Sequence, residues 1–121
     1  MENKKTLVIG ASENPARYSN MAINRLKNHQ HPVVAIGNKK GNVAGIPVGT
    51  EKIQLEDIDT VTLYINPAIQ KEYYNYIISL HPKRIIFNPG TENDELAELA
   101  EKNNIKPVEA CTLVLLSTGQ Y

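Results

Sequence analysis

Four short apolar runs, each closed by glycine or by an Asn-Pro pair, constrain the fold of this chain more than any other feature. The runs are continuous rather than alternating, which is typical of strands in a parallel sheet whose two faces are both covered. A fifth apolar stretch follows near the end of the chain. We therefore predict five strands, at Thr6–Ile9, Pro32–Ile36, Val61–Ile65, Arg84–Phe87 and Ile105–Glu109.

Apolar residues at helical spacing separate most of these strands. The spacing predicts helices over Ser19–Asn28 with Ser19 as the cap, over Ala68–Leu80 directly after Pro67, and over Thr91–Asn103 with acids in the first turn. Alternating strands and helices indicate an α/β fold with a Rossmann-like, doubly wound parallel sheet of five strands in the order 3-2-1-4-5. A length of 121 residues predicts that residues 1–121 form a single domain.

Composition narrows the class of protein. The chain is 41% hydrophobic and 21% charged, as in ordinary soluble proteins. No apolar run approaches the roughly 20 residues of a membrane helix, and no signal-peptide core follows the N-terminus. One cysteine forms no internal disulfide, and three scattered histidines form no metal-ligand cluster. We expect a cytoplasmic protein without a metal and without a membrane partner.

Charge is distributed unevenly along the chain. Residues 1–50 carry seven Lys and Arg against two acids, whereas residues 51–121 carry six against eleven. A nucleic-acid-binding protein is usually basic overall or has a dense basic stripe, so nucleic acid is not an expected partner. The basic first half suits a smaller anionic ligand, and an uneven surface without function explains it equally well.

The loop after the first predicted strand has the residue types of a phosphate site. It begins with Gly10-Ala11-Ser12 and continues through Asn14 and Arg17 to Ser19. Backbone N–H groups at a helix N-terminus with a guanidinium nearby bind a pyrophosphate, although an ordinary turn with an exposed arginine has the same sequence. The loop lacks the dinucleotide fingerprint, because Ser12 replaces its second glycine.

The turn after the second predicted strand indicates which nucleotide the protein would bind. A protein that binds NAD places Asp or Glu there to accept the ribose hydroxyls, but this chain has Asn38, Lys39 and Lys40. NAD is therefore disfavoured, whereas NADP or another nucleotide with a ribose phosphate is permitted. A solvated basic turn is the alternative.

Four motifs in this order resemble the stand-alone CoA-binding domain proteins. The motifs are Gly10–Ser19, Asn38–Gly41, Gly45–Val48 and Asn88–Asn93, and the resemblance runs from about Leu7 to Cys111. These proteins are single-domain relatives of the CoA-binding domain of the succinyl-CoA synthetase α-subunit. The chain departs from them at Lys40, where relatives often have glycine, and at Gly37-Asn38, where Asn-Pro is commoner.

The resemblance implies coenzyme A as the ligand and assigns its contacts. It implies that Gly10, Ala11, Ser12 and Arg17 hold the pyrophosphate, with Asn14 and Ser19 in the same loop, and that Lys39 meets the 3′-phosphoadenosine end beside Asn38 and Lys40. It further implies that Ile65, Asn66 and Pro67 lie along the adenine or pantetheine, and that Asn88, Pro89 and Gly90 lie near the pantetheine. The phosphohistidine of the synthetase lies in a second domain that this chain lacks, so ligase activity is not implied.

Cys111 follows the last predicted strand, so it should lie at the carboxyl edge of the sheet. An isolated cysteine is often a small buried hydrophobe. The other interpretation is that Cys111 lines the pantetheine end, because the resemblance places a cysteine at the corresponding strand end. Only a helix start after Cys111 would lower the pKa of its thiol, so we expect slow reactivity.

Three functions from different classes remain open. The first is a non-catalytic protein that binds CoA or an acyl-CoA, with no catalytic residue, since no histidine has a partner at a readable spacing. The second is an NADP-binding oxidoreductase-type domain, although 121 residues leave no room for a substrate domain. The third is an interaction subunit with a degenerate nucleotide site. The segment Thr112–Tyr121 would pack on the domain or form a homodimer contact.

Overall fold

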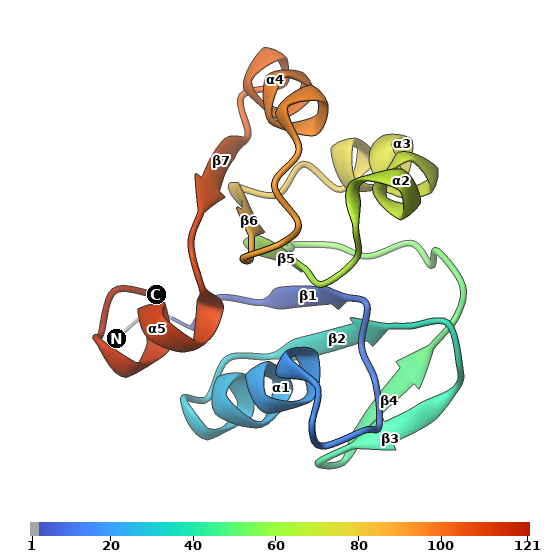
Figure 1. Cartoon of the computed structure of the whole chain (residues 1–121), viewed down its shortest axis with the longest axis vertical. Coiled ribbons are helices and arrows are strands. Elements are labelled where there is room, and N and C mark those ends of the chain that lie inside the picture. Colours follow the sequence, from blue (N-terminus) through green and yellow to red (C-terminus); the bar gives the residue numbers. More distant parts are fainter. Residues whose placement is uncertain (1–2) are drawn as a thin grey trace.

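This computed structural model describes residues 3–121, in which helices separate some of the strands and four successive strands follow one another with no helix between them (Figure 1). The strands are β1 (Thr6–Ile9), β2 (Val33–Ile36), β3 (Gly41–Val43), β4 (Ile46–Gly49), β5 (Thr60–Leu63), β6 (Arg84–Phe87) and β7 (Lys106–Glu109). The helices are α1 (Tyr18–Asn28), α2 (Pro67–Gln70), the 3₁₀ turn η1 (Lys71–Tyr73), α3 (Tyr74–Ser79), α4 (Asp94–Lys102) and α5 (Thr112–Ser117). Within this range no helix is both long and apolar enough to cross a membrane.

The seven strands form one sheet in the order β3-β4-β2-β1-β5-β6-β7. All neighbours pair in parallel except β3 and β4, which form an antiparallel hairpin. The α/β Rossmann-like class is therefore confirmed, but the prediction of five parallel strands is wrong, because the sheet is mixed and has seven. The order 3-2-1-4-5 applies only when β4 is counted as the third strand, which moves β5 to the fourth place beside β1.

The missed hairpin has a physical explanation. Its strands are only three and four residues long, and Pro47 interrupts the apolar pattern of β4. Such a segment has neither the continuous run of a central strand nor a clean alternation. The turn between the strands places Ala44 and Gly45 at positive φ, as tight hairpins require.

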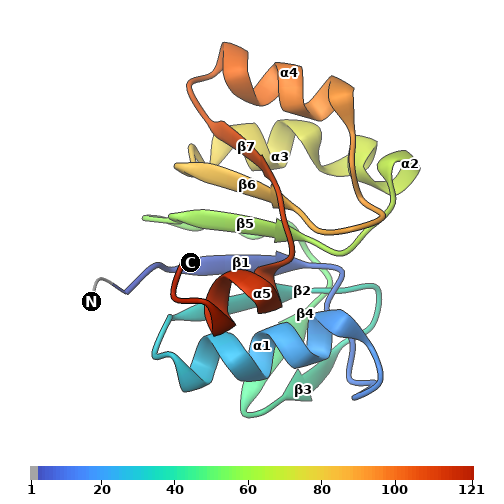
Figure 2. The same cartoon turned by 60° about the vertical axis from the view of Figure 1, so that its left-hand side comes forward.

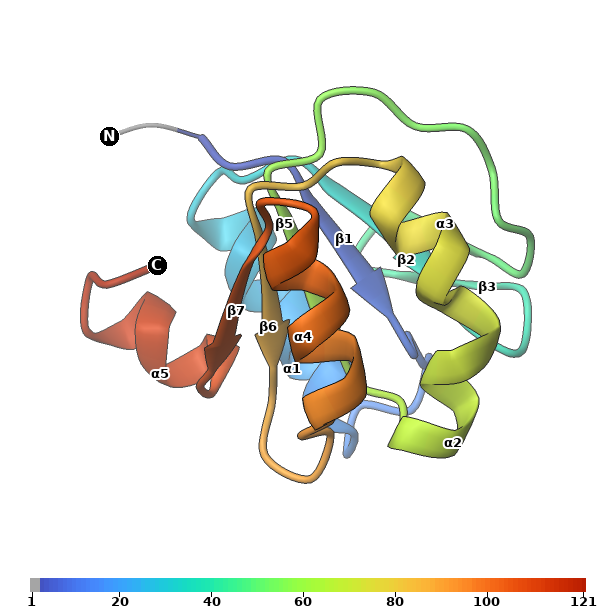
Figure 3. The same cartoon turned by 90° about the horizontal axis from the view of Figure 1, so that it is seen from above.

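Helices cover both faces of the sheet, which is why its central strands are apolar throughout. Figures 2 and 3 show α1 and α5 on one face and α2, α3 and α4 on the other. Leu7 and Ile9 of β1 pack in the core under α3 and α4, whereas Val8 packs in the core under α1 and α5. All three side chains are fully buried.

Two helix predictions need correction. Ser19 is not the cap of α1: it is the second residue of the helix and is buried, while the N-cap position belongs to Arg17, which makes no side-chain capping bond. The single helix expected over Ala68–Leu80 is divided by η1. A 3₁₀ turn keeps apolar residues at nearly helical spacing, so the sequence period does not reveal it.

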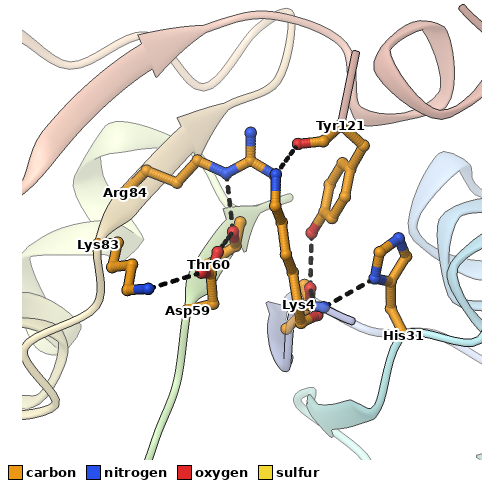
Figure 4. Close-up of polar contacts among 8 residues, drawn as sticks. Lys4, His31, Asp59, Thr60, Lys83, Arg84 and Tyr121 are labelled. Atoms are coloured by element: carbon orange, nitrogen blue, oxygen red, sulfur yellow. Dashed lines mark hydrogen bonds and ion pairs between the residues drawn. The ribbon is translucent and has the colours of Figure 1, made fainter. Parts of the chain in front are cut away.

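Tyr121 anchors the segment after α5 to the amino-terminal edge of the sheet. Figure 4 shows its ring between Arg84 and His31, and its hydroxyl lies 2.6 Å from Thr6 Oγ1. Lys4 contributes twice, since its Nζ donates to the Tyr121 carbonyl and its backbone N–H donates to His31 Nδ1 at 2.9 Å. The segment therefore packs on its own domain, the first of the two arrangements expected for it.

We predict that His31 makes folding pH-dependent. Burial lowers the pKa of His31, and the nearby charges of His29, Lys4 and Arg84 act in the same direction. At a pH near 6.5, the ordinary pKa of histidine, the unfolded chain therefore binds more protons at His31 than the folded chain does. The free energy of unfolding is highest above that pH and falls as the pH drops below it. His31→Gln keeps a hydrogen-bond acceptor without titrating. Chemical denaturation between pH 8 and 5 should show a steeper loss for the wild type than for His31→Gln, and equal slopes would contradict the prediction.

Candidate functional site: a groove at the carboxyl edge of the sheet

The order of the strands reverses between β1 and β5, so the loops that leave these two strands run in opposite directions along the sheet. From β1 the chain crosses to β2 on one side, whereas β5 leads on to β6 on the other side. In open α/β sheets, ligands bind in the crevice outside the carboxyl ends of the strands at this switch point. The residues around it are therefore the first candidates for a site.

A cleft of about 340 Å³, here called the near cleft, opens between the loops that follow β1, β2 and β5. It is lined by Gly10, Ala11, Ser12, Arg17, Gly37, Asn38, Tyr64, Ile65, Asn66, Ile69 and Tyr73. The structure thus brings together three of the segments that were singled out separately in the sequence.

Two glycines let the loops approach this closely. Gly10 has a φ of +97°, and a Cβ on it would lie 2.8 Å from the backbone of Tyr64. A Cβ on Gly37 would lie 2.3 Å from the carbonyl oxygen of Ala11. Backbone bonds hold the same approach, since Ala11 N–H donates to the Ile36 carbonyl at 3.0 Å. Larger residues at either position would push the walls of the cleft apart.

Helix α1 begins at the near cleft with its first turn uncapped. Arg17 holds the N-cap position in extended backbone, no side chain caps the turn, and no acidic residue lies in it. The exposed Arg17 side chain also lines the cleft. Backbone N–H groups, the helix dipole and a guanidinium together favour an anion at this end of the site.

The loop between β1 and α1 is braced from within. Asn14 N–H donates to Ser12 Oγ at 3.1 Å, and Asn14 Oδ1 accepts from Ala16 N–H at 3.0 Å. Asn20 of α1 donates to the Ser12 carbonyl at 2.9 Å, and Glu13 accepts from Asn42 N–H. Asn14, which was a candidate ligand contact, does not line the cleft, and its side chain instead shapes the loop.

Two further hollows continue the near cleft toward β6 and β7. One of about 270 Å³ includes Ser19, Gly90 and Thr91 in its wall. The other, here called the far hollow, has a volume of about 240 Å³. It is lined by Tyr18, Tyr64, Asn88, Pro89, Cys111 and Leu113. Tyr64 borders all three spaces, and we call them together the strand-end groove.

Asn88 organises the wall of the far hollow with its own hydrogen bonds. Its Nδ2 donates to Thr62 Oγ1 at 2.7 Å and to the Leu63 carbonyl at 2.9 Å, and its Oδ1 accepts from Thr112 N–H at 2.9 Å. Both amide hydrogens are thereby used within the protein. Asn88 ties the ends of β5 and β6 to the start of α5, so it builds the site instead of offering donors to a ligand.

Tyr64 is the most central residue that the sequence reasoning missed. Its hydroxyl is buried and has no hydrogen-bond partner. Burial raises the pKa of Tyr64 to about 12, with Thr62 and Thr112 acting in the opposite direction. The phenol therefore stays neutral at physiological pH. Its position directly after β5 was the available signal, but the predicted strand extended through Ile65 and hid it.

Other lining residues were missed for similar reasons. Tyr18, Gly37, Ile69, Tyr73 and Leu113 carry no motif of their own, and tertiary contacts alone bring them to the groove. Of these, Tyr18 is 69% exposed, an unusual state for an aromatic side chain beside a cleft. It forms part of the rim between the two ends of the groove.

Besides Asn14, three predicted residues lie outside the groove. Lys39 is exposed in the turn beyond Asn38, next to the cleft without lining it. Lys40 borders a different hollow, together with Pro47 and Ile53. Pro67 is the first residue of α2, behind Asn66, whose Oδ1 accepts from Ile69 N–H at 3.0 Å. These residues are neighbours of the site, and their contact with a ligand stays a prediction.

Cys111 is half-buried and lines the far hollow, so it is not the fully buried core residue of the first interpretation. It occupies the N-cap position of α5, as the expected helix start implied. Within residues 3–121 no group of three or more His, Cys, Asp or Glu side chains could hold a metal ion.

Comparison with known proteins identifies relatives of this architecture. The family model described as CoA binding domain matches residues 4–117. A crystal structure of an uncharacterized protein has 52% identity and a TM-score of 0.97, with full coverage of both chains. A hypothetical protein from Pyrococcus horikoshii OT3 has 25% identity and a TM-score of 0.87, over 97% of this chain and 84% of its own. No curated protein matches.

A larger protein shares the fold. The acetyl-coenzyme A synthetase 1 of Ca. Korarchaeum cryptofilum, solved with phosphate and ADP, superposes with a TM-score of 0.70 and 14% identity. The match covers 89% of this chain and 26% of that chain. At this identity the likeness is one of fold alone.

We predict that Gly37→Ala disturbs the near cleft and Gly49→Ala does not. The new Cβ at residue 37 would collide with the Ala11 carbonyl, whereas a Cβ at residue 49 would meet no atom within 4 Å. Overpacking of this kind costs roughly 1–3 kcal/mol, which corresponds to a fall in Tm of several degrees. Calorimetry of both variants checks the prediction, and an equal Tm for the two would refute the close approach.

Proposed function

The chain belongs to the CoA-binding domain family, and on that premise we propose that it is a non-catalytic protein that binds CoA or an acyl-CoA in the strand-end groove. The observation that carries this proposal is the gradient of charge along the groove. The near cleft has Arg17 and the uncapped start of α1, whereas the far hollow has no charged side chain in its lining. CoA has the same asymmetry, with phosphates at one end and a neutral pantetheine arm at the other.

The gradient orients the ligand. In this proposal the pyrophosphate lies at Gly10, Ala11, Ser12 and Arg17, where backbone N–H groups and a guanidinium favour an anion. The 3′-phosphate lies toward the turn of Asn38 and Lys39. The pantetheine arm then passes Ile65 and Asn66, crosses Tyr64, and reaches the far hollow at Pro89 and Cys111. Ser19 and Gly90 border this path.

The chemistry of the lining supports binding without catalysis. Among the described residues, no carboxylate and no imidazole lines the strand-end groove. General acid–base catalysis most often uses an imidazole or a carboxylate within hydrogen-bond reach of the reacting atoms. Asn88, a polar side chain in the wall of the far hollow, uses its side-chain amide in hydrogen bonds within the protein.

We predict that CoA raises the Tm of the protein and that NAD does not. A ligand that binds only the folded state stabilises it by RT ln(1 + [L]/Kd), about 2.7 kcal/mol at a hundredfold excess over Kd. NAD lacks the phosphate on its ribose that the basic turn would accept. Thermal-shift measurements with CoA, NADP and NAD at equal concentrations compare the changes in Tm that the three nucleotides cause. A shift with NADP but not with CoA would replace the proposal by an oxidoreductase-type domain, and no shift with any nucleotide would favour an interaction subunit.

The second test concerns the 3′-phosphate. If Lys39 pairs with it, Lys39→Glu should weaken CoA more than dephospho-CoA, which lacks that group. Since Lys39 is exposed, solvent screening limits the expected difference to roughly three- to tenfold. Lys40→Glu is the matched control, because it makes the same change of charge beside a different hollow. Titration calorimetry measures both affinities, and equal losses for the two ligands would remove Lys39 from the site.

A further inference from the structure

The far hollow differs in chemistry from the rest of the strand-end groove. Its lining has no Lys, Arg, His, Asp or Glu, and its aromatic and aliphatic surface comes from Tyr18, Tyr64, Pro89 and Leu113. The Tyr64 hydroxyl is buried, so it is not exposed to this space. The Asn88 amide hydrogens are already bonded within the protein. The remaining polar side-chain groups of the lining are the hydroxyl of the exposed Tyr18 and the thiol of Cys111, both of them neutral, and the thiol is a weak hydrogen-bond donor.

The position of the far hollow also suits the group attached to the thiol of CoA. The far hollow shares Tyr64 with the near cleft, and Arg17, which lines both the near cleft and the hollow of about 270 Å³, does not line it. If the phosphates of CoA occupy the cationic end, its thiol arrives at this apolar end. The volume of the far hollow, about 240 Å³, is below the roughly 300–1,000 Å³ of a site for a drug-sized ligand, so this space suits a small chemical group.

We infer that the far hollow binds the acyl group of an acyl-CoA and selects uncharged acyl chains over acyl chains that end in a carboxylate. The inference rests on the proposed function, because it needs CoA in the groove. An apolar chain gains free energy by leaving water for this lining. A terminal carboxylate would lose hydration without meeting a cation in this lining, and a neutral hydroxyl such as that of Tyr18 would replace only part of that hydration.

Butyryl-CoA and succinyl-CoA form a matched pair for the test. Both have a four-carbon acyl group, and they differ by a methyl or a carboxylate at its end. Each fully buried methylene strengthens binding about fourfold, and the butyryl chain has two methylenes and a methyl. We therefore expect butyryl-CoA to bind at least about tenfold, and with complete burial about 60-fold, more tightly than CoA. Succinyl-CoA should bind no more tightly than CoA. Titration calorimetry of the wild-type protein with the three ligands measures both differences.

Two variants locate the selectivity in the far hollow. Leu113→Arg places a cation in the lining and should reverse the preference toward succinyl-CoA. Val114→Arg adds the same charge to the neighbouring residue of α5, which is 55% exposed and outside the lining, and it should keep the wild-type preference. If Leu113→Arg does not fold, the wild-type ligand series still decides the question.

The outcomes separate the two proposals. If CoA binds but butyryl-CoA and succinyl-CoA bind within twofold of each other, the inference about the acyl group is overturned and the proposed function stands. Equal reversal by Leu113→Arg and Val114→Arg would show a long-range charge effect and would also overturn it. If neither CoA nor a thioester binds, both proposals fall.

Discussion

Burial of β1 on both faces is the constraint on which the rest of the molecule depends. Leu7 and Ile9 face one core and Val8 faces the other, with no exposed surface. A strand covered in this way needs a helical layer on each side, and right-handed crossovers then carry the chain outward from β1 in both directions. The reversal of strand order beside β1 follows, and so does the meeting of loops that forms the strand-end groove.

The two ends of the groove differ in how many of their polar groups are hydrogen-bonded within the protein. Around the far hollow the Asn88 amide, the Thr62 and Thr112 hydroxyls, the Leu63 carbonyl and the Thr112 N–H are hydrogen-bonded to one another. At the near cleft, the first turn of α1 has no capping side chain. Satisfied polar groups leave an apolar surface, whereas uncapped N–H groups leave an anion-binding one. This contrast gives the groove its polarity along a single direction, which is the physical basis of the proposed function.

The parts of the fold that the sequence could predict are those set by local patterns. Continuous apolar runs located β1, β2, β5, β6 and β7 to within a few residues, because burial on both faces leaves a clear signature. The β3–β4 hairpin escaped detection, since short strands at the edge of a sheet are held by pairing more than by burial. The start of α1 was misplaced because capping depends on which side chain reaches the first N–H groups.

By itself, the sequence determined which loops follow the strands and which polar residues and glycines these loops contain. Gly10, Arg17, Asn38 and Asn88 were all found in this way. Only the tertiary structure decided which side chains share one groove. It brought Tyr64, Tyr18 and Leu113 together from three separate segments, and it turned Lys40 and Asn14 away. The reason is physical: chain order specifies each strand end, but the distance between two strand ends depends on pairing, crossover and packing across the whole sheet.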